Sequence, residues 1–259
     1  MVDQDAQVGA GVTIEPFVTI HGDVIIGDNC IIKSHAVIMN GTRLGRSCSI
    51  YQGAIVGGLP QDLKYSGEQT ELIIEDHVTI REYCTINKGT AASGETRIKS
   101  HALIMAYVHV AHDCNIGHHA IIANSVNLAG HVIIGNYAVV GGMTAVQQFV
   151  HIGESAFIGG GGLVRKDVPP YVKAAREPIS YVGVNSVGLR RRNFSLHRIN
   201  GIKDIYRSLF VRHKNISFGL EEIEVTLPES REKDEIVGFI KNSKHGLIRG
   251  FRQTKRDDY

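Results

Sequence analysis

Long apolar runs, a strong net charge and a dense set of cysteines are all missing from this sequence. The 259 residues carry a net charge of only +2, which gives no reason to expect nucleic-acid binding. The N-terminal segment MVDQDAQVGAGVTIEPF has an early acidic residue and no continuous apolar stretch, so it predicts neither a signal peptide nor a membrane span. We therefore expect a cytoplasmic protein with no integral membrane segment, whose four cysteines stay reduced.

What the sequence does have is a period of six residues. Every sixth position from Val8 to Val164 gives 27 positions, and all but Asp62, Glu68 and Ala92 are isoleucine, valine or leucine. Neither a helix nor an ordinary strand has this period, so it predicts a repeat architecture. Three hexads close one coil of 18 residues, with the aliphatic positions inward and stacked coils about 4.8 Å apart. The next residue is often glycine, which suits a tight corner with a positive φ.

Two stretches leave the register, and the repeat then ends. Residues 57–73 carry a proline and charged residues at inward positions, and residues 87–97 are small and polar, so both predict loops, where binding residues concentrate. The two prolines of Asp167–Val172 end regular pairing. Beyond them, helical spacing behind Ser195 and Ser230 predicts capped helices. We expect a parallel β-helix over 1–184 and a helical domain over 185–259 that covers the open end of the prism.

Residues 18 apart stack on neighbouring coils wherever the register is unbroken, and this juxtaposes groups suited to acid–base chemistry. Two adjacent columns are His112, Gly130 and Gln148, and Asp113, His131 and Phe149, with His109 close by. A histidine beside a carboxylate is a natural general base, and a glycine offers an unobstructed N–H for an oxyanion. This set suits the deprotonation of a sugar hydroxyl as it attacks a thioester. Spacing alone also allows surface histidines or a zinc site.

Two further patterns allow more than one interpretation. Gly159 to Gly162 keep the hexad register, so they indicate strand and corner, or a surface along which an alkyl chain lies, rather than a phosphate loop. Arg190 to Arg192 follow the repeat, and they are either a solvated charge cluster or a site for a pyrophosphate or an acidic carrier.

Several segments together resemble one family. They are IYQGAIVGGLPQDLKYSGE (50–68), TINKGT (85–90), HVAHDC (109–114), LAGHV (128–132), GGMTAV (141–146), DVPPYV (167–172) and GVNSVGLRRRNFS (183–195). They look like the acyl-carrier-protein-dependent UDP-N-acetylglucosamine O-acyltransferases of lipid A biosynthesis, within the hexapeptide-repeat superfamily. The resemblance implies that the coil is left-handed, which ordinary right-handed crossovers do not predict. It also implies a homotrimer with sites between neighbouring subunits.

The resemblance also implies a reaction and a role for particular residues. A 3-hydroxyacyl chain passes from the phosphopantetheine of acyl carrier protein to the 3-hydroxyl of the UDP-sugar, with no other cofactor and no metal. His112 matches the general base, Asp113 its supporting acid and Gly130 the oxyanion amide. The remaining matches are substrate contacts at Asp62, Lys64, His109, His131 and Gln148, uridine-nucleotide contacts at Asn185, Arg191 and Arg192, and the acyl-length position at Gly160.

The sequence departs from the family pattern at Asn87, Gln147 and Val187, and these departures concern sugar, phosphate or uridine contacts rather than the reaction type. Glycine at position 160 leaves room for a long acyl chain. Two alternatives stay open. One is an N-acyltransferase acting on a 3-amino sugar nucleotide, and the other is a trimeric β-helix scaffold without catalysis.

Overall fold

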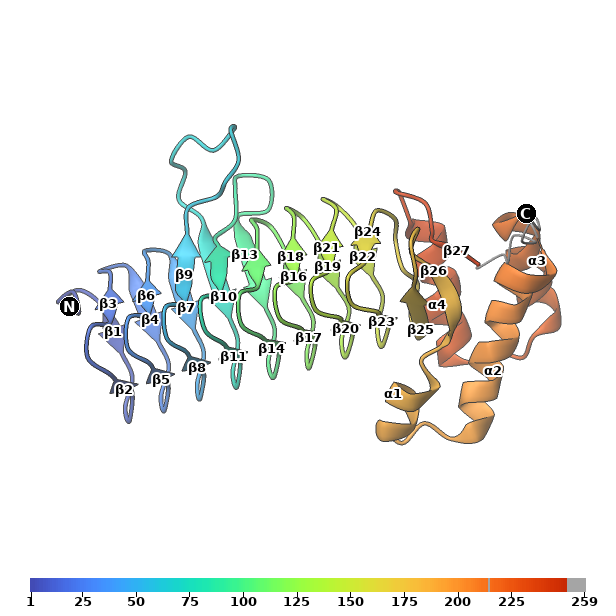
Figure 1. Ribbon diagram of the computed structural model, residues 1–259, viewed down its shortest axis with the longest axis horizontal. Coiled ribbons are helices and arrows are strands. Elements are labelled where there is room, and N and C mark those ends of the chain that lie inside the picture. Colours follow the sequence, from blue (N-terminus) through green and yellow to red (C-terminus); the bar gives the residue numbers. More distant parts are fainter. Residues whose placement is uncertain (214, 251–259) are drawn as a thin grey trace, which may run out of the picture.

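Three parallel β-sheets wind into a long prism in the computed structural model, which describes residues 1–213 and 215–250 (Figure 1). Sheet 1 contains β1 (Gln7–Val8), β4 (Val24–Ile26), β7 (Thr42–Leu44), β10 (Glu71–Ile74), β13 (Glu95–Ile98), β16 (Asn115–Ile116), β19 (Ile133–Ile134) and β22 (His151–Ile152). Sheet 3 contains β3 (Thr19–Ile20), β6 (Val37–Ile38), β9 (Ile55–Gly58), β12 (Thr85–Asn87), β15 (His109–Val110), β18 (Asn127–Leu128), β21 (Ala145–Val146) and β24 (Leu163–Val164). The prism is a left-handed parallel β-helix, as expected.

Sheet 2 is the longest of the three because the chain returns to it after the coils end. Its strands are β2 (Thr13–Ile14), β5 (Ile31–Ile32), β8 (Ser49–Ile50), β11 (Thr79–Ile80), β14 (Leu103–Ile104), β17 (Ile121–Ile122), β20 (Val139–Val140), β23 (Phe157–Ile158), β25 (Val172–Ala175), β26 (Ser180–Val184) and β27 (Arg249–Gly250). The antiparallel pair of β25 and β26 therefore connects the prism to the helices that follow.

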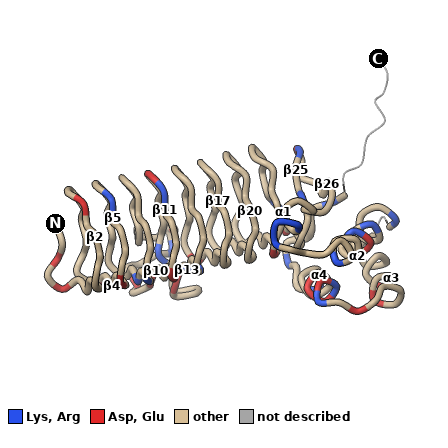
Figure 2. The backbone as a smooth tube through the Cα atoms, turned by 90° about the horizontal axis from the view of Figure 1, so that it is seen from below, with Lys and Arg blue, Asp and Glu red and all other residues tan. Residues whose placement is uncertain are grey.

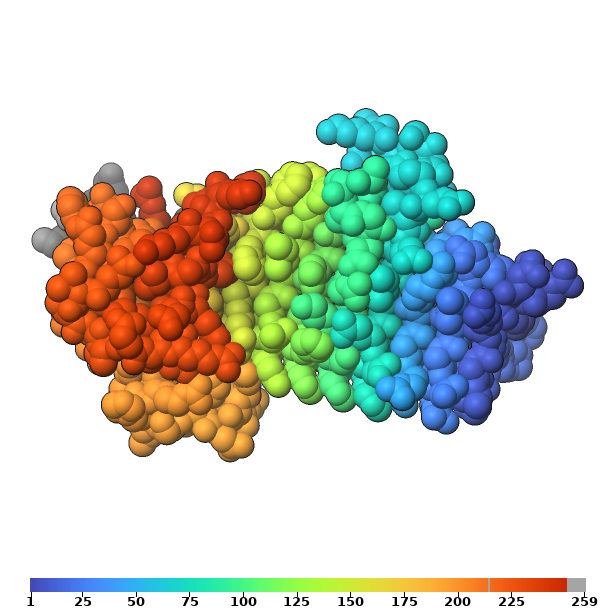
Figure 3. Space-filling view, turned by 180° about the vertical axis from the view of Figure 1, so that it is seen from behind, coloured from blue at the N-terminus to red at the C-terminus, as the bar shows by residue number. Residues whose placement is uncertain are grey.

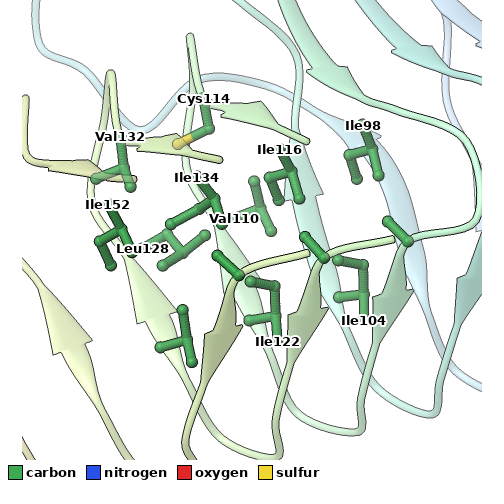
Figure 4. Close-up of a cluster of buried hydrophobic side chains, with 14 of the residues drawn as sticks. Ile98, Ile104, Val110, Cys114, Ile116, Ile122, Leu128, Val132, Ile134 and Ile152 are labelled. Atoms are coloured by element: carbon green, nitrogen blue, oxygen red, sulfur yellow. The ribbon is translucent and has the colours of Figure 1, made fainter. Parts of the chain in front are cut away.

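The aliphatic column forms the core of the prism. Ile104, Val110 and Ile116 are fully buried, and they come from sheets 2, 3 and 1 in turn (Figure 4). Each such side chain stabilises the fold by about 2 kcal/mol relative to exposure. The strand register confirms that a regular coil closes after three hexads, since His109 pairs with Asn127 on the next coil.

The two breaks in the hexad register are loops that leave one edge of the prism. Ile55 pairs with Thr85 and Thr85 pairs with His109, so both of these coils are longer than the regular one. Because each insertion adds a whole number of hexads, the aliphatic column returns in phase after it. The loops span residues 59–70 and 88–94 and project together from the edge that joins sheet 3 to sheet 1 (Figure 1).

The expected role of the corner glycines is wrong at most of the positions. The positive φ lies two residues later, on non-glycine residues such as His119 (φ 56°) and Tyr137 (φ 58°). Gly117 is required for a different reason, because a Cβ there would lie 2.6 Å from the backbone nitrogen of Asn136 on the next coil. Close approach of stacked coils, rather than backbone conformation, thus selects glycine at this position.

Helices pack against the C-terminal end of the prism. They are α1 (Ser186–Arg191), α2 (Leu196–Arg207), the π-helical η1 (Ser208–Arg212), α3 (Ile216–Thr226) and α4 (Arg231–Asn242). The predicted caps are confirmed, since Ser195 accepts a hydrogen bond from the Arg198 N–H and Ser230 accepts one from the Lys233 N–H. The last part of the expected helical domain, 251–259, lies outside the described residues. No helix in the described ranges is long and apolar enough to cross a membrane.

Candidate active site

The candidate catalytic residues lie on the edge between sheets 3 and 1, here called the 3–1 edge, whose corners include residues 111–114, 129–132 and 147–150. The loops 59–70 and 88–94 rise from the same edge on the preceding coils, and they form the projection that Figure 3 shows in space-filling form. The fold therefore brings both loops and both predicted columns to one side of the molecule.

His112 and Asp113 form a buried hydrogen-bonded pair. The Nδ1 atom of His112 lies 2.7 Å from Oδ2 of Asp113, and the side chain of Asp113 is fully buried. Asp113 is the residue of positive φ in its corner (φ 61°), a conformation that aspartate tolerates better than most residues. Its backbone N–H donates to the Thr96 hydroxyl at 2.8 Å. The contact between His112 and Asp113 fixes the tautomer of the imidazole with the proton on Nδ1, leaving Nε2 free to accept one.

The Asp113 carboxylate is held as an anion by several donors. Burial by itself raises the pKa of this group, but hydrogen bonds from Ser93, His112 and Thr90 outweigh that effect and lower the pKa to about 2. Thr90 donates both its N–H to Oδ1 at 2.9 Å and its hydroxyl to Oδ2 at 2.7 Å, and the Ser93 hydroxyl also donates to Oδ1. The carboxylate therefore stays charged and can stabilise a protonated His112.

Gly130 lies directly against the His112 ring on the next coil. A Cβ at position 130 would lie 2.6 Å from Cε1 and 2.7 Å from Nε2 of His112. Within the described residues, the Gly130 N–H donates no hydrogen bond. At the equivalent corner position, the His118 N–H is capped by the Asn136 side chain at 2.9 Å. The Gly130 N–H is thus an available donor beside the free nitrogen of the histidine.

The other predicted contact residues lie on or beside the 3–1 edge, and Asp62 and His131 approach the pair. Asp62, on the loop 59–70, places Oδ2 at 4.0 Å from His112 Nε2, and His131 places Nε2 at 3.5 Å from Asp113 Oδ2. His109 lies 2.7 Å from the Thr85 hydroxyl, and burial followed by the neighbouring His112 lowers its pKa. Lys64 follows Asp62 on the loop, and Gln148 is exposed on the coil after Gly130.

The same cluster offers a possible set of metal ligands. Ligand atoms of His112, Asp113 and His131 lie within 4.8 Å of one another. Both Asp113 oxygens, however, already accept hydrogen bonds, and a metal on His112 Nδ1 would displace the contact of 2.7 Å. The donor set therefore suits proton transfer better than metal ligation.

The predicted nucleotide contacts lie on a different edge of the same chain. Asn185 donates to the Ser155 carbonyl, and Arg192 forms an ion pair with Glu154 at 3.2 Å and lies 3.5 Å from the Tyr137 ring centre. Residues 153–156 form a corner between sheets 1 and 2, not the 3–1 edge. Arg191 is exposed on α1, whose basic residues stand out in blue in Figure 2.

Gly160 occupies the third edge, in a corner between sheets 2 and 3. A Cβ there would lie 2.9 Å from the Gly142 carbonyl oxygen. One chain thus spreads the predicted residues over three edges, and it does not bring the base, the nucleotide contacts and the acyl-length position together.

Sequence reasoning missed the residues that surround Asp113. Thr90, Ser93 and Thr96 precede it by 23, 20 and 17 residues, offsets that differ from the length of a regular coil. The available signal was the small polar composition of 87–97, which predicted a loop but not the group that the loop serves.

A prism of hexapeptide repeats with a histidine–carboxylate pair and a free backbone N–H defines a hexapeptide-repeat acyltransferase. A family model described as bacterial transferase hexapeptide (six repeats) matches residues 5–40 and 95–130, and one described as UDP-N-acetylglucosamine O-acyltransferase, domain 2, matches residues 167–248. The chain belongs to the UDP-N-acetylglucosamine O-acyltransferase family.

Similar proteins support this assignment over nearly the full length. The acyl-[acyl-carrier-protein]–UDP-N-acetylglucosamine O-acyltransferase of Chlorobaculum parvum is 48% identical over 95% of this chain and 94% of its own. The one from Halorhodospira halophila is 45% identical over 96% and 97%. Among solved structures, the UDP-N-acetylglucosamine acyltransferase of Bacteroides fragilis has a TM-score of 0.94 and 44% identity, covering 96% of this chain and 97% of its own.

Proposed function

We propose that this enzyme transfers a 3-hydroxyacyl chain from acyl carrier protein to the 3-hydroxyl of UDP-N-acetylglucosamine, the first step of lipid A biosynthesis, with His112 as general base. One observation carries the assignment of the base. The Nδ1 atom of His112 is engaged by Asp113 at 2.7 Å, while Nε2 faces Asp62 across 4.0 Å beside the unpaired Gly130 N–H of the described chain. A hydroxyl between Nε2 and Asp62 lies within reach of both.

In the proposed transfer, three groups of the site act in turn. Nε2 of His112 takes the proton of the sugar hydroxyl as its oxygen attacks the thioester carbonyl. The Gly130 N–H donates to the oxyanion of the tetrahedral intermediate, and the Asp113 carboxylate stabilises the imidazolium. Collapse of the intermediate breaks the C–S bond, and the departing thiolate of the phosphopantetheine takes the proton from Nε2.

We further propose that the enzyme is a homotrimer whose sites lie between neighbouring subunits. Within one chain, Asn185 and Arg192 are bound to the edge between sheets 1 and 2, while His112 lies on the 3–1 edge. A second copy is needed to bring a nucleotide held by Asn185, Arg191 and Arg192 to the base. In this arrangement, the residues that contact the sugar and phosphates from the side of the base are Asp62, Lys64, His109, His131 and Gln148.

The three departures from the family pattern have different consequences. Asn87 donates its amide to the Leu59 carbonyl and so helps to hold the loop 59–70, whereas Gln147 and Val187 are exposed. We propose that these three departures change the affinity for the sugar or for the nucleotide. No metal or resident cofactor takes part in this scheme, and we place the reaction in the cytoplasm, where the four buried free thiols stay reduced.

The test of this function is acyl transfer from a panel of 3-hydroxyacyl carrier proteins to UDP-N-acetylglucosamine. Glycine at position 160 has no side chain near Gly142, so it leaves room for a long acyl chain. We therefore expect kcat/KM for 3-hydroxytetradecanoyl or longer donors to exceed kcat/KM for the 3-hydroxydecanoyl donor by at least about tenfold. A preference for the 3-hydroxydecanoyl donor would contradict the chain-length proposal. Transfer only to the 3-amino analogue would assign the N-acyltransferase activity instead, and no transfer to either acceptor would favour the scaffold.

A further inference from the structure

The short loop 88–94 is the one polar insertion of the repeat that the reaction scheme leaves without a role. We propose that Thr90 and Ser93 on this loop are positioning residues, which orient the Asp113 carboxylate and through it the imidazole of His112. The proposal rests on the proposed function of His112 as the base, and it assigns a catalytic purpose to the loop itself.

The contacts fix Asp113 from three directions. Its Oδ1 accepts from the Thr90 N–H at 2.9 Å and from the Ser93 hydroxyl, and its Oδ2 accepts from the Thr90 hydroxyl and from His112 Nδ1, both at 2.7 Å. With donors on both oxygens, the carboxylate cannot rotate without losing a charge-assisted hydrogen bond. The plane of the carboxylate, and hence the direction of the histidine ring, is set by the loop.

The regular coil does not supply these donors. On the following coils of the same edge, the equivalent corner residues His131 and Phe149 stack face to face at 4.5 Å between ring centres. Asp113 is the equivalent residue on its own coil, and the coil before it carries the loop 88–94 instead of a regular corner. The insertion thus supplies hydroxyl and amide donors to the carboxylate of Asp113, at a corner position where the two following coils carry stacked rings.

Burial and hydrogen bonds hold the loop 88–94 in its observed conformation. Thr90 is buried, and its carbonyl accepts from the Gly94 N–H at 2.8 Å. The Thr70 hydroxyl donates to the Gly89 carbonyl at 2.6 Å, so the loop is also attached to the end of the loop 59–70. Because that second loop carries Asp62, the two loops together place a carboxylate on each side of the His112 ring.

The experiment compares steady-state kinetics of the full-length Ser93→Ala and Thr90→Val variants with those of the wild type. We expect kcat to fall about tenfold for each single variant and about 100-fold for the double variant, with KM for the UDP-sugar unchanged. Ser93→Thr and Thr90→Ser retain a hydroxyl at each position, and we expect them to restore kcat to within about twofold of the wild type.

A matched control removes a similar hydrogen bond from the same prism. The Ser100 hydroxyl donates to Glu75 Oε2 at 3.0 Å, away from the His112–Asp113 pair, and Ser100→Ala is expected to keep the wild-type kcat. Wild-type kcat in Ser93→Ala and Thr90→Val, together with an inactive His112→Ala, would overturn the positioning role and leave the function standing. An equal loss in Ser100→Ala, or no recovery in the hydroxyl-retaining variants, would also overturn it. An active His112→Ala would overturn both proposals.

Discussion

Replacement of His112 by alanine is expected to lower kcat by about 10³-fold, with little change in KM for the UDP-sugar. The imidazole is the only described side chain whose free nitrogen lies beside both Asp62 and the Gly130 N–H, so no neighbouring group replaces it as a proton acceptor. His131 is the nearest substitute, but its Nε2 faces the Asp113 carboxylate at 3.5 Å. The measurement is kcat and KM with a saturating acyl carrier protein donor.

A histidine of the helical part provides the control for this variant. His197 is exposed on α2, and His197→Ala is expected to keep the wild-type kcat. The assignment of the base would be wrong if His112→Ala kept more than about a tenth of the wild-type kcat, since general-base catalysis contributes far more than that.

The second large effect is expected from Gly130→Ala, which adds one methyl group. The new Cβ would lie 2.6 Å from Cε1 and 2.7 Å from Nε2 of His112, so the ring must turn away from Gly130 and strain or break its hydrogen bond to Asp113. A displacement of the base by about 1 Å costs on the order of 100-fold in rate, and we expect a loss of kcat of this size. The backbone itself accepts alanine here, because φ at position 130 is not positive.

A second glycine variant separates crowding at the site from a general effect of removing glycine. Gly201 lies in α2, and a Cβ added there would meet no atom within 4 Å. Gly201→Ala is therefore expected to keep activity and to raise the free energy of unfolding by about 0.5–1 kcal/mol. Equal kcat values for Gly130→Ala and the wild type would show that the ring does not need its observed position.

The sequence predicts the fold well because the information is periodic and local. One aliphatic residue in six specifies a strand and an inward direction, and the stacking of successive coils follows from the closure of a three-sided coil. The stacking of residues 18 apart is by itself enough to place Gly130 beside His112. The capping serines of α2 and α4 are equally local signals, since each side chain accepts a hydrogen bond from an N–H early in its own helix.

The parts that escape prediction depend on contacts that the period does not encode. Thr90 and Ser93 reach Asp113 from an irregular loop, so no fixed spacing in the sequence predicts their contacts with Asp113. The corner glycines follow from the approach of the next coil rather than from their own φ, which a single hexad does not reveal. Likewise, the placement of Arg192 on an edge other than that of His112 follows from the path of β25 and β26.

Mixed trimers test most directly the proposal that His112 of one copy acts on a nucleotide held by another copy. One chain carries His112→Ala, the other carries Arg191→Ala and Arg192→Ala, and each alone is expected to be nearly inactive. In trimers assembled from equal amounts of both, a shared site predicts about a quarter of the wild-type activity, because that share of sites draws both parts from intact chains. If no activity returned in trimers verified to contain both chains, the base and the nucleotide contacts would belong to one chain, and the proposed shared site would be wrong.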